Sequence, residues 1–142
     1  MLKGVARSYE SRYQQQEEVF TLFVNFTNHP SDKWSFEQLS AAKSYGEIIN
    51  IPFPMVDPQG DENYIKELAE QSVTQILSYK PSAVLCQGEM TLAFAIVSIL
   101  AYKCRINVFA ACSERVTKES VGPDGKTIKT AEFRFVRFRK YF

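Results

Sequence analysis

Cysteine, histidine and net charge are all scarce in this chain of 142 residues. Cys86, Cys104 and Cys112 are odd in number, show no C-x-x-C spacing and lie in apolar segments. We therefore expect reduced core thiols, without disulfides and without a zinc site. The formal net charge of +1 argues against a protein that coats long nucleic acid, because such binding depends on many phosphate contacts. A small anionic ligand remains compatible with this charge.

Long apolar runs are missing as well. No stretch is long enough to span a membrane, and residues 1–18 lack the apolar centre of a signal peptide. We therefore expect a cytoplasmic protein with no membrane partner. Residues 1–18 hold too few apolar side chains for a core element and are predicted to form a polar N-terminal arm. Residues 19–142 are long enough for a single domain with one core.

What the chain does contain is a regular alternation of apolar strands and helical patterns. The predicted strands are residues 19–26, 47–52, 83–86 and 106–112, and the predicted helices are residues 35–45, 62–79 and 90–102. This βαβαβαβ order predicts an α/β domain of three layers with a mainly parallel sheet.

Turn residues predict how the chain finishes. Residues 116–121 and 127–138 have strand character and flank Gly122-Pro123-Asp124-Gly125, which favours an antiparallel β-hairpin at the C-terminus. The alternation of the second arm slips phase, and a β-bulge near Val136 would restore it. At the other end of the domain, a capping box that begins at Ser35 predicts the start of the first helix.

The predicted helix at residues 90–102 is apolar nearly all round. A helix of this kind is buried on most sides, and a second subunit could supply part of the cover. We therefore expect a homodimer, with residues 90–102 or the C-terminal strand at the interface.

The strand at residues 83–86 ends in a polar turn that opens directly into this helix. Open α/β sheets bind ligands beyond the carboxyl ends of their strands, so Gln87, Gly88, Glu89 and Thr91 are expected at the mouth of a site. Gly88 would allow a close ligand, and the N–H groups of residues 88–91, including Met90, favour an anion. The alternative is that Gln87 and Glu89 only end a strand and begin a helix.

Two further polar segments follow strand ends. His29 is the only histidine; it either acts as a base or ligand contact, or only shapes the turn before a proline. Asn28 and Ser31 can bond a phosphate or an adenine edge, although both residue types are common in turns. Ser113 and Arg115 follow the strand at residues 106–112. Arg115 is predicted to stabilise a phosphate, with a salt bridge to a neighbouring glutamate as the alternative.

Four segments in this order resemble the small stand-alone CRISPR-associated proteins related to ring nucleases. The segments are residues 22–30, 87–91, 111–115 and 133–139. The resemblance implies a Rossmann-like domain of the CARF type that acts as a homodimer and binds cyclic tetra-adenylate, the second messenger of type III CRISPR defence. Two-fold symmetry of the ring suits a two-fold dimer.

The resemblance also implies a reaction without a cofactor or metal. Many members linearise the ring by attack of a ribose 2′-hydroxyl on its own phosphodiester, which positioning and charge stabilisation can accelerate, and so switch off the signal. The catalytic candidates are then His29, Gln87, Glu89, Ser113 and Arg115, and the ligand-binding candidates are Asn25, Thr27, Asn28, Ser31, Gly88, Met90 and Thr91. Two alternatives remain: a sensor or sponge that binds the ring without cutting it, or an α/β interaction protein whose hairpin pairs with a partner.

Overall fold

The computed structural model describes residues 21–142, so the predicted arm at residues 1–18 lies outside the described part. The elements are β1 (Leu22–Phe26), a 3₁₀ turn η1 (Ser31–Lys33), α2 (Phe36–Lys43), β2 (Glu47–Asn50), α3 (Glu62–Leu77), β3 (Ala83–Cys86), α4 (Met90–Ser98), a π-helical turn η2 (Ile99–Lys103), β4 (Asn107–Val121) and β5 (Thr127–Lys140). None of the helices in residues 21–142 combines the length and apolar character needed to cross a bilayer.

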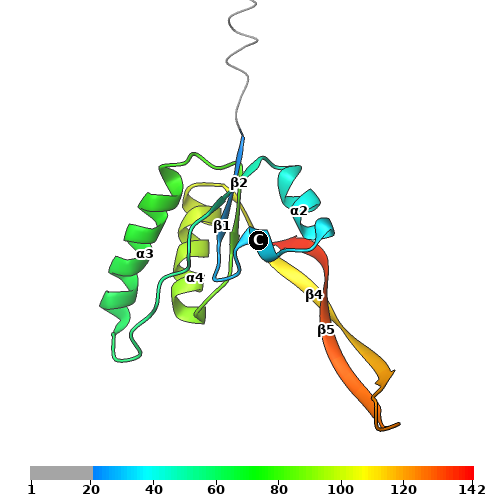
Figure 1. Ribbon diagram of the computed structural model, residues 1–142. Coiled ribbons are helices and arrows are strands. Elements are labelled where there is room, and N and C mark those ends of the chain that lie inside the picture. Colours follow the sequence, from blue (N-terminus) through cyan, green and yellow to red (C-terminus); the bar gives the residue numbers. More distant parts are fainter. Residues whose placement is uncertain (1–20) are drawn as a thin grey trace, which may run out of the picture.

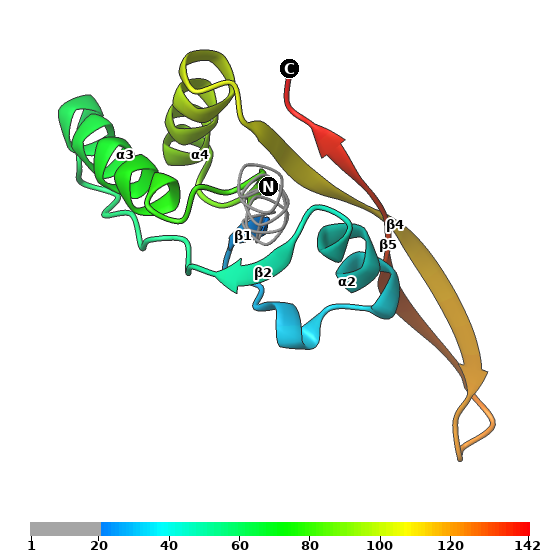
Figure 2. The same cartoon turned by 90° about the horizontal axis from the view of Figure 1, so that it is seen from above.

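The sheet has five strands in the order β2-β1-β3-β4-β5 (Figures 1 and 2). The first four are mutually parallel, and β5 runs antiparallel to β4. Helices α3 and α4 cover one face of the sheet, and α2 covers the other (Figure 2). The predicted Rossmann-like α/β domain with a mainly parallel sheet and a C-terminal antiparallel hairpin is therefore confirmed.

Successive residues of the central strands pack against opposite layers. Val24 and Val84 belong to the core under α3 and α4, whereas Phe23 and Leu85 belong to the core under α2. Because both faces are covered, β1 and β3 are nearly continuous apolar runs. Ser35 caps α2 as predicted, because its hydroxyl accepts a hydrogen bond from the N–H of Gln38 at 3.2 Å.

The predicted end of the fourth strand at Cys112 is wrong. β4 continues through Ser113-Glu114-Arg115 to Val121, because pairing with β5 satisfies its backbone groups after β3 has ended. The distal parts of β4 and β5 form a ribbon that projects from the body of the domain (Figure 1). Both faces of this ribbon are largely exposed, which explains why polar residues here are compatible with a strand.

The predicted bulge is confirmed. Cys112 pairs with Arg137 and Ser113 pairs with Phe135, so Val136 is left without a partner in β4. The extra residue puts Phe135 on the same face as Phe138, and their ring centroids are 5.0 Å apart.

Candidate ligand-binding site

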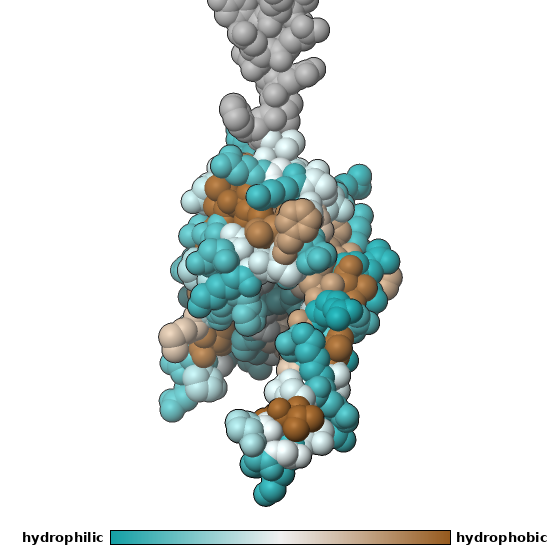
Figure 3. Space-filling view, turned by 45° about the vertical axis from the view of Figure 1, so that its right-hand side comes forward, coloured by the Kyte–Doolittle hydropathy of each residue, from teal (hydrophilic) through white to brown (hydrophobic). Residues whose placement is uncertain are grey.

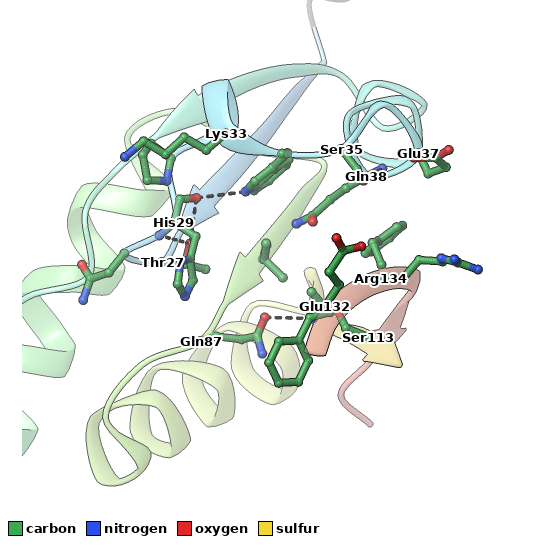
Figure 4. A pocket seen from close by; sticks show the side chains of 17 residues that line it. Thr27, His29, Lys33, Ser35, Glu37, Gln38, Gln87, Ser113, Glu132 and Arg134 are labelled. Carbon is green, nitrogen blue, oxygen red and sulfur yellow. Dashed lines mark hydrogen bonds between the residues drawn. The ribbon is translucent and has the colours of Figure 1, made fainter. Parts of the chain in front are cut away.

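A cavity of about 780 Å³ lies where the carboxyl ends of β1, β3 and the parallel part of β4 meet the returning strand β5 (Figure 4). This is the edge at which open α/β sheets bind ligands. Of the predicted site residues, Thr27, Asn28, His29, Gln87 and Ser113 line it. The complete lining is Thr27, Asn28, His29, Pro30, Lys33, Trp34, Ser35, Glu37, Gln38, Leu85, Gln87, Ala111, Ser113, Glu132, Phe133, Arg134 and Phe135.

The loop after β1 is held in place by the buried side chain of Asn25. Its Nδ2 donates to the carbonyl of His29 and to Oδ1 of Asn50, both at 2.9 Å. Its Oδ1 accepts from the hydroxyl of Thr27 at 2.8 Å. Both donor bonds of the Asn25 amide are thus made within the protein, and Asn25 does not line the cavity, so its side chain orders the loop. A ligand contact from Asn25 stays a prediction.

Thr27 and Ser31 are also committed to this network. The Thr27 hydroxyl accepts from the N–H of His29 at 3.1 Å, and Asn50 Nδ2 donates to Ser31 Oγ at 2.9 Å. Thr27 is buried at the cavity wall, whereas Ser31 lies outside the lining. The hydrogen bonds of both hydroxyls fix the loop, and the predicted ligand contacts of Thr27 and Ser31 stay predictions.

His29 anchors the loop through its backbone and leaves its imidazole available. The His29 carbonyl accepts from Asn25 Nδ2 and from Trp34 Nε1 at 3.0 Å (Figure 4). The side chains of Asn28 and His29 are exposed at the cavity. Within the described residues the imidazole has no hydrogen-bond partner, so a preordered backbone presents an unoccupied base.

Gln87 has a fixed amide orientation. Its Oε1 accepts from the N–H of Ala111 at 2.9 Å, which continues the pairing of β3 with β4 through a side chain. Because a backbone N–H can bond only the amide oxygen, Nε2 is left to donate elsewhere. Gln87 lines the cavity and can therefore donate to a phosphate oxygen or to an acceptor on a base.

The predicted anion site at the start of α4 is occupied by the protein itself. Glu89 accepts hydrogen bonds from the N–H groups of Thr91 and Leu92 at 3.1 and 2.9 Å, and from the Thr91 hydroxyl at 2.7 Å. The bond from that hydroxyl, followed by the two backbone bonds, lowers the pKa of Glu89. A carboxylate in this position repels a second anion, and neither Glu89 nor Thr91 lines the cavity.

Gly88 is required by packing, not by a close ligand. A Cβ at this position would overlap the ring of Phe53, which is buried against Phe26. Gly88 and Met90 instead border a second, mainly apolar cavity of about 300 Å³, together with Phe94 and Tyr141. The predicted ligand contacts from the turn at residues 87–91 are therefore reduced to Gln87 in the larger cavity.

The continuation of β4 separates two residues that were expected to act together. Ser113 lines the cavity, whereas Arg115 lies further along the projecting ribbon, pairs with Phe133 and is exposed. Within one protomer Arg115 is not among the residues that line the larger cavity. Its role in stabilising a phosphate stays a prediction.

The charges around the cavity are balanced. Lys33 and Arg134 contribute cations, and Glu37 and Glu132 contribute carboxylates. Glu132 pairs with Lys118 on the ribbon at 2.9 Å, and Arg134 lies 3.7 Å from a carboxylate oxygen of Glu114. These exposed pairs are weak.

The segment at the start of α2 and the strand β5 supply walls of the cavity that were not among the predicted site residues. Trp34, Gln38, Phe133 and Phe135 line the cavity. The first two predict only a helix start, and the alternation of aromatic and basic residues in the C-terminal strand is more common in a solvated edge strand than in a nucleic-acid platform. Ordinary strand alternation already puts Phe133 and Phe135 on one face of β5, and the bulge at Val136 brings Phe138 to the same face.

None of the three cysteines lines the larger cavity. Cys86 is buried, and desolvation raises the pKa of its thiol to about 12, which keeps it protonated and unreactive. Cys104 and Cys112 are half-buried and free. In the part of the chain that the structure describes, no three His, Cys, Asp or Glu side chains gather as metal ligands.

Comparison with known proteins places the chain in a family. No curated protein and no solved structure matches it. A family model does match, over residues 21–139, a range that includes every helix and strand described above except the last residue of β5. The chain therefore belongs to the Uncharacterized protein MJ1673 family.

Proposed function

We propose that this protein binds cyclic tetra-adenylate in the larger cavity and linearises it, as a CARF-type ring nuclease of type III CRISPR defence. The observation that carries the proposal is the preordered loop at residues 27–30, which presents Asn28 and His29 across from Gln87 and Ser113. A ring nuclease of this kind needs only side chains that position the ring and a side chain that takes up a proton.

The reaction assigns a task to each of these side chains. His29 accepts the proton of a ribose 2′-hydroxyl as its oxygen attacks the adjacent phosphorus. The bond from phosphorus to the 5′ oxygen breaks, and that oxygen takes a proton from water. The products are a 2′,3′-cyclic phosphate and a 5′-hydroxyl. Gln87 Nε2 and Ser113 donate to the phosphate oxygens as charge develops on them.

Two copies of the chain suit such a ring better than one. The ring carries four phosphates, and each cavity has only Lys33 and Arg134 as lining cations. A homodimer would face two cavities toward the two halves of the ring. The exposed apolar side chains of α4 support this assembly: Met90 is 83% and Phe94 is 76% exposed. Large apolar side chains exposed together on a helix are typical of a surface that binds a partner.

The test is incubation with cyclic tetra-adenylate in excess EDTA, followed by chromatography. The expected product is linear and ends in a 2′,3′-cyclic phosphate. His29→Ala is expected to lower turnover by roughly a hundredfold and to change affinity by less than a few-fold, because general base assistance acts in the transition state. The loop should persist in this variant, since its anchor is the His29 carbonyl.

An exposed loop residue provides the matched control. Asn28 lies beside His29 at the cavity, so Asn28→Ala should lower affinity and leave the rate of the bound ring nearly unchanged. Ring that is retained but stays intact would instead support the sensor or sponge. Absence of binding would contradict both functions.

A further inference from the structure

Phe133 is a large aromatic side chain left open at the mouth of the cavity. It is 78% exposed, although it lines the cavity and sits in a well-paired part of β5. Strand alternation puts it on the same face as Phe135, two residues further along. Its exposure therefore results from a lack of neighbours beyond the body of the domain, not from a strand that turns it away.

From Phe133 toward the body of the domain, the aromatic side chains of β5 become progressively more buried. Phe135 is half-buried, and Phe138 is buried in the core under α2. Trp34 stands on the adjoining side, with its centroid 6.4 Å from that of Phe138 and its Nε1 bonded to the His29 carbonyl. These contacts fix Trp34 and Phe135, so an entering ligand meets a preformed aromatic surface.

The polar side chains of the lining suit the edges of a planar ring. Gln87 Nε2 is free to donate, and Asn28 and Gln38 provide amides that both donate and accept. Apolar side chains on one wall and amides on the others would be a poor site for a lipid tail. Nucleobases combine a stacking face with a hydrogen-bonding edge, and proteins bind single-stranded nucleic acid through such contacts.

We propose that Phe133 is the stacking platform for a nucleobase, which it holds against the wall formed with Phe135 and Trp34. This assignment rests on the proposed function in one respect only, the choice of an adenylate ring as the ligand. The platform itself predicts a preference for ligands that carry a purine over ligands that offer the same phosphate without a base. Phe133 thereby determines specificity, whereas His29 acts on the reacting atoms.

Trp34 makes the proposal directly measurable. It is the only tryptophan of the chain and lines the same cavity, so its emission reports occupancy. Titrations use cyclic tetra-adenylate, adenosine 5′-monophosphate and ribose 5-phosphate. Phe133→Leu should weaken binding of the two adenine ligands by about tenfold to a hundredfold, because it keeps an apolar side chain and removes the ring. Phe133→Tyr should retain binding within a few-fold.

The chain offers a matched control for the loss of an exposed phenylalanine. Phe36 on α2 is also 78% exposed and does not line the cavity, so Phe36→Leu should leave all affinities unchanged. Since neither ring is buried, both variants should melt within about 3 °C of the wild type.

The outcomes separate the platform from the proposed function. If cyclic tetra-adenylate binds wild type and Phe133→Leu equally well, the platform is refuted and the function stands. If the cyclic ring fails to bind but adenosine 5′-monophosphate binds in a manner that depends on Phe133, the function fails and the platform stands. Equal affinity for ribose 5-phosphate and adenosine 5′-monophosphate, or no binding of any probe, overturns the platform.

Discussion

Replacement of Asn25 by alanine tests the idea that one buried amide orders the candidate site. The substitution removes two donor bonds of 2.9 Å, to the His29 carbonyl and to Asn50, and one bond of 2.8 Å accepted from Thr27. Each is worth about 1 kcal/mol net. The His29 carbonyl keeps its bond from Trp34, so no acceptor is stranded completely. We therefore expect Asn25→Ala to lower the free energy of unfolding by about 3 kcal/mol.

Urea unfolding followed by the emission of Trp34 measures this loss. The probe is sensitive to the loop because Trp34 Nε1 donates to the same carbonyl as Asn25 Nδ2. Asn28→Ala is the control, since Asn28 lies in the same loop but is exposed, and its effect should stay within about 0.5 kcal/mol. A loss below about 1 kcal/mol for Asn25→Ala would refute the view that this amide holds the loop.

Three further perturbations follow from the turn at the start of α4 and from its outer face. Gly88→Ala should destabilise the fold by about 1 to 3 kcal/mol in urea unfolding, because its Cβ would overlap the buried ring of Phe53, and unchanged stability would mean that the turn relaxes freely. The pKa of Glu89 is lowered from 4.5, so its capping stabilises the protein above that pH and is lost as the pH falls below it. Thermal melts of Glu89→Gln should lack this part of the acid dependence, and parallel pH profiles would contradict the cap. Phe94→Glu should dissociate the proposed homodimer in light scattering, whereas a monomeric wild type at micromolar concentration would rule the dimer out.

Most of the fold could be predicted from the sequence because its determinants are local. Apolar periodicity gave the order of strands and helices, and the hydroxyl of Ser35 gave the start of α2. The phase slip in the second arm of the hairpin located the bulge at Val136. Each of these signals lies within a few residues of the structure that it determines.

The wrong predictions depended on distant partners. Ser113-Glu114-Arg115 suggested a loop, but pairing with residues 133–135 of β5 makes it a strand. Gly88 suggested a close ligand, but the atoms next to it belong to Phe53, which lies far away in the sequence. In neither case could the local pattern show which segment would pack against it.

Glu89 is a different kind of error, since its role was present in the local sequence. The helix dipole favours an acid at the start of a helix, and the carboxylate of Glu89 accepts from the N–H groups of Thr91 and Leu92. The same N–H groups cannot serve both a capping side chain and a bound phosphate. Of the two interpretations of Glu89, capping and ligand binding, the hydrogen bonds support capping.

The salt dependence of ligand binding decides whether cations outside the cavity take part. The only lysine and arginine that line each cavity are Lys33 and Arg134. Two copies would therefore offer four lining cations to the ring. Each phosphate neutralised on a single strand contributes about −0.7 to the slope of log affinity against log salt, which predicts a slope no steeper than about −3. Lys33→Ala should make it shallower. A slope steeper than about −5, reduced by Arg115→Ala but not by Arg139→Ala, would show that the projecting ribbon reaches the ligand and that the cavity lining alone does not define the site.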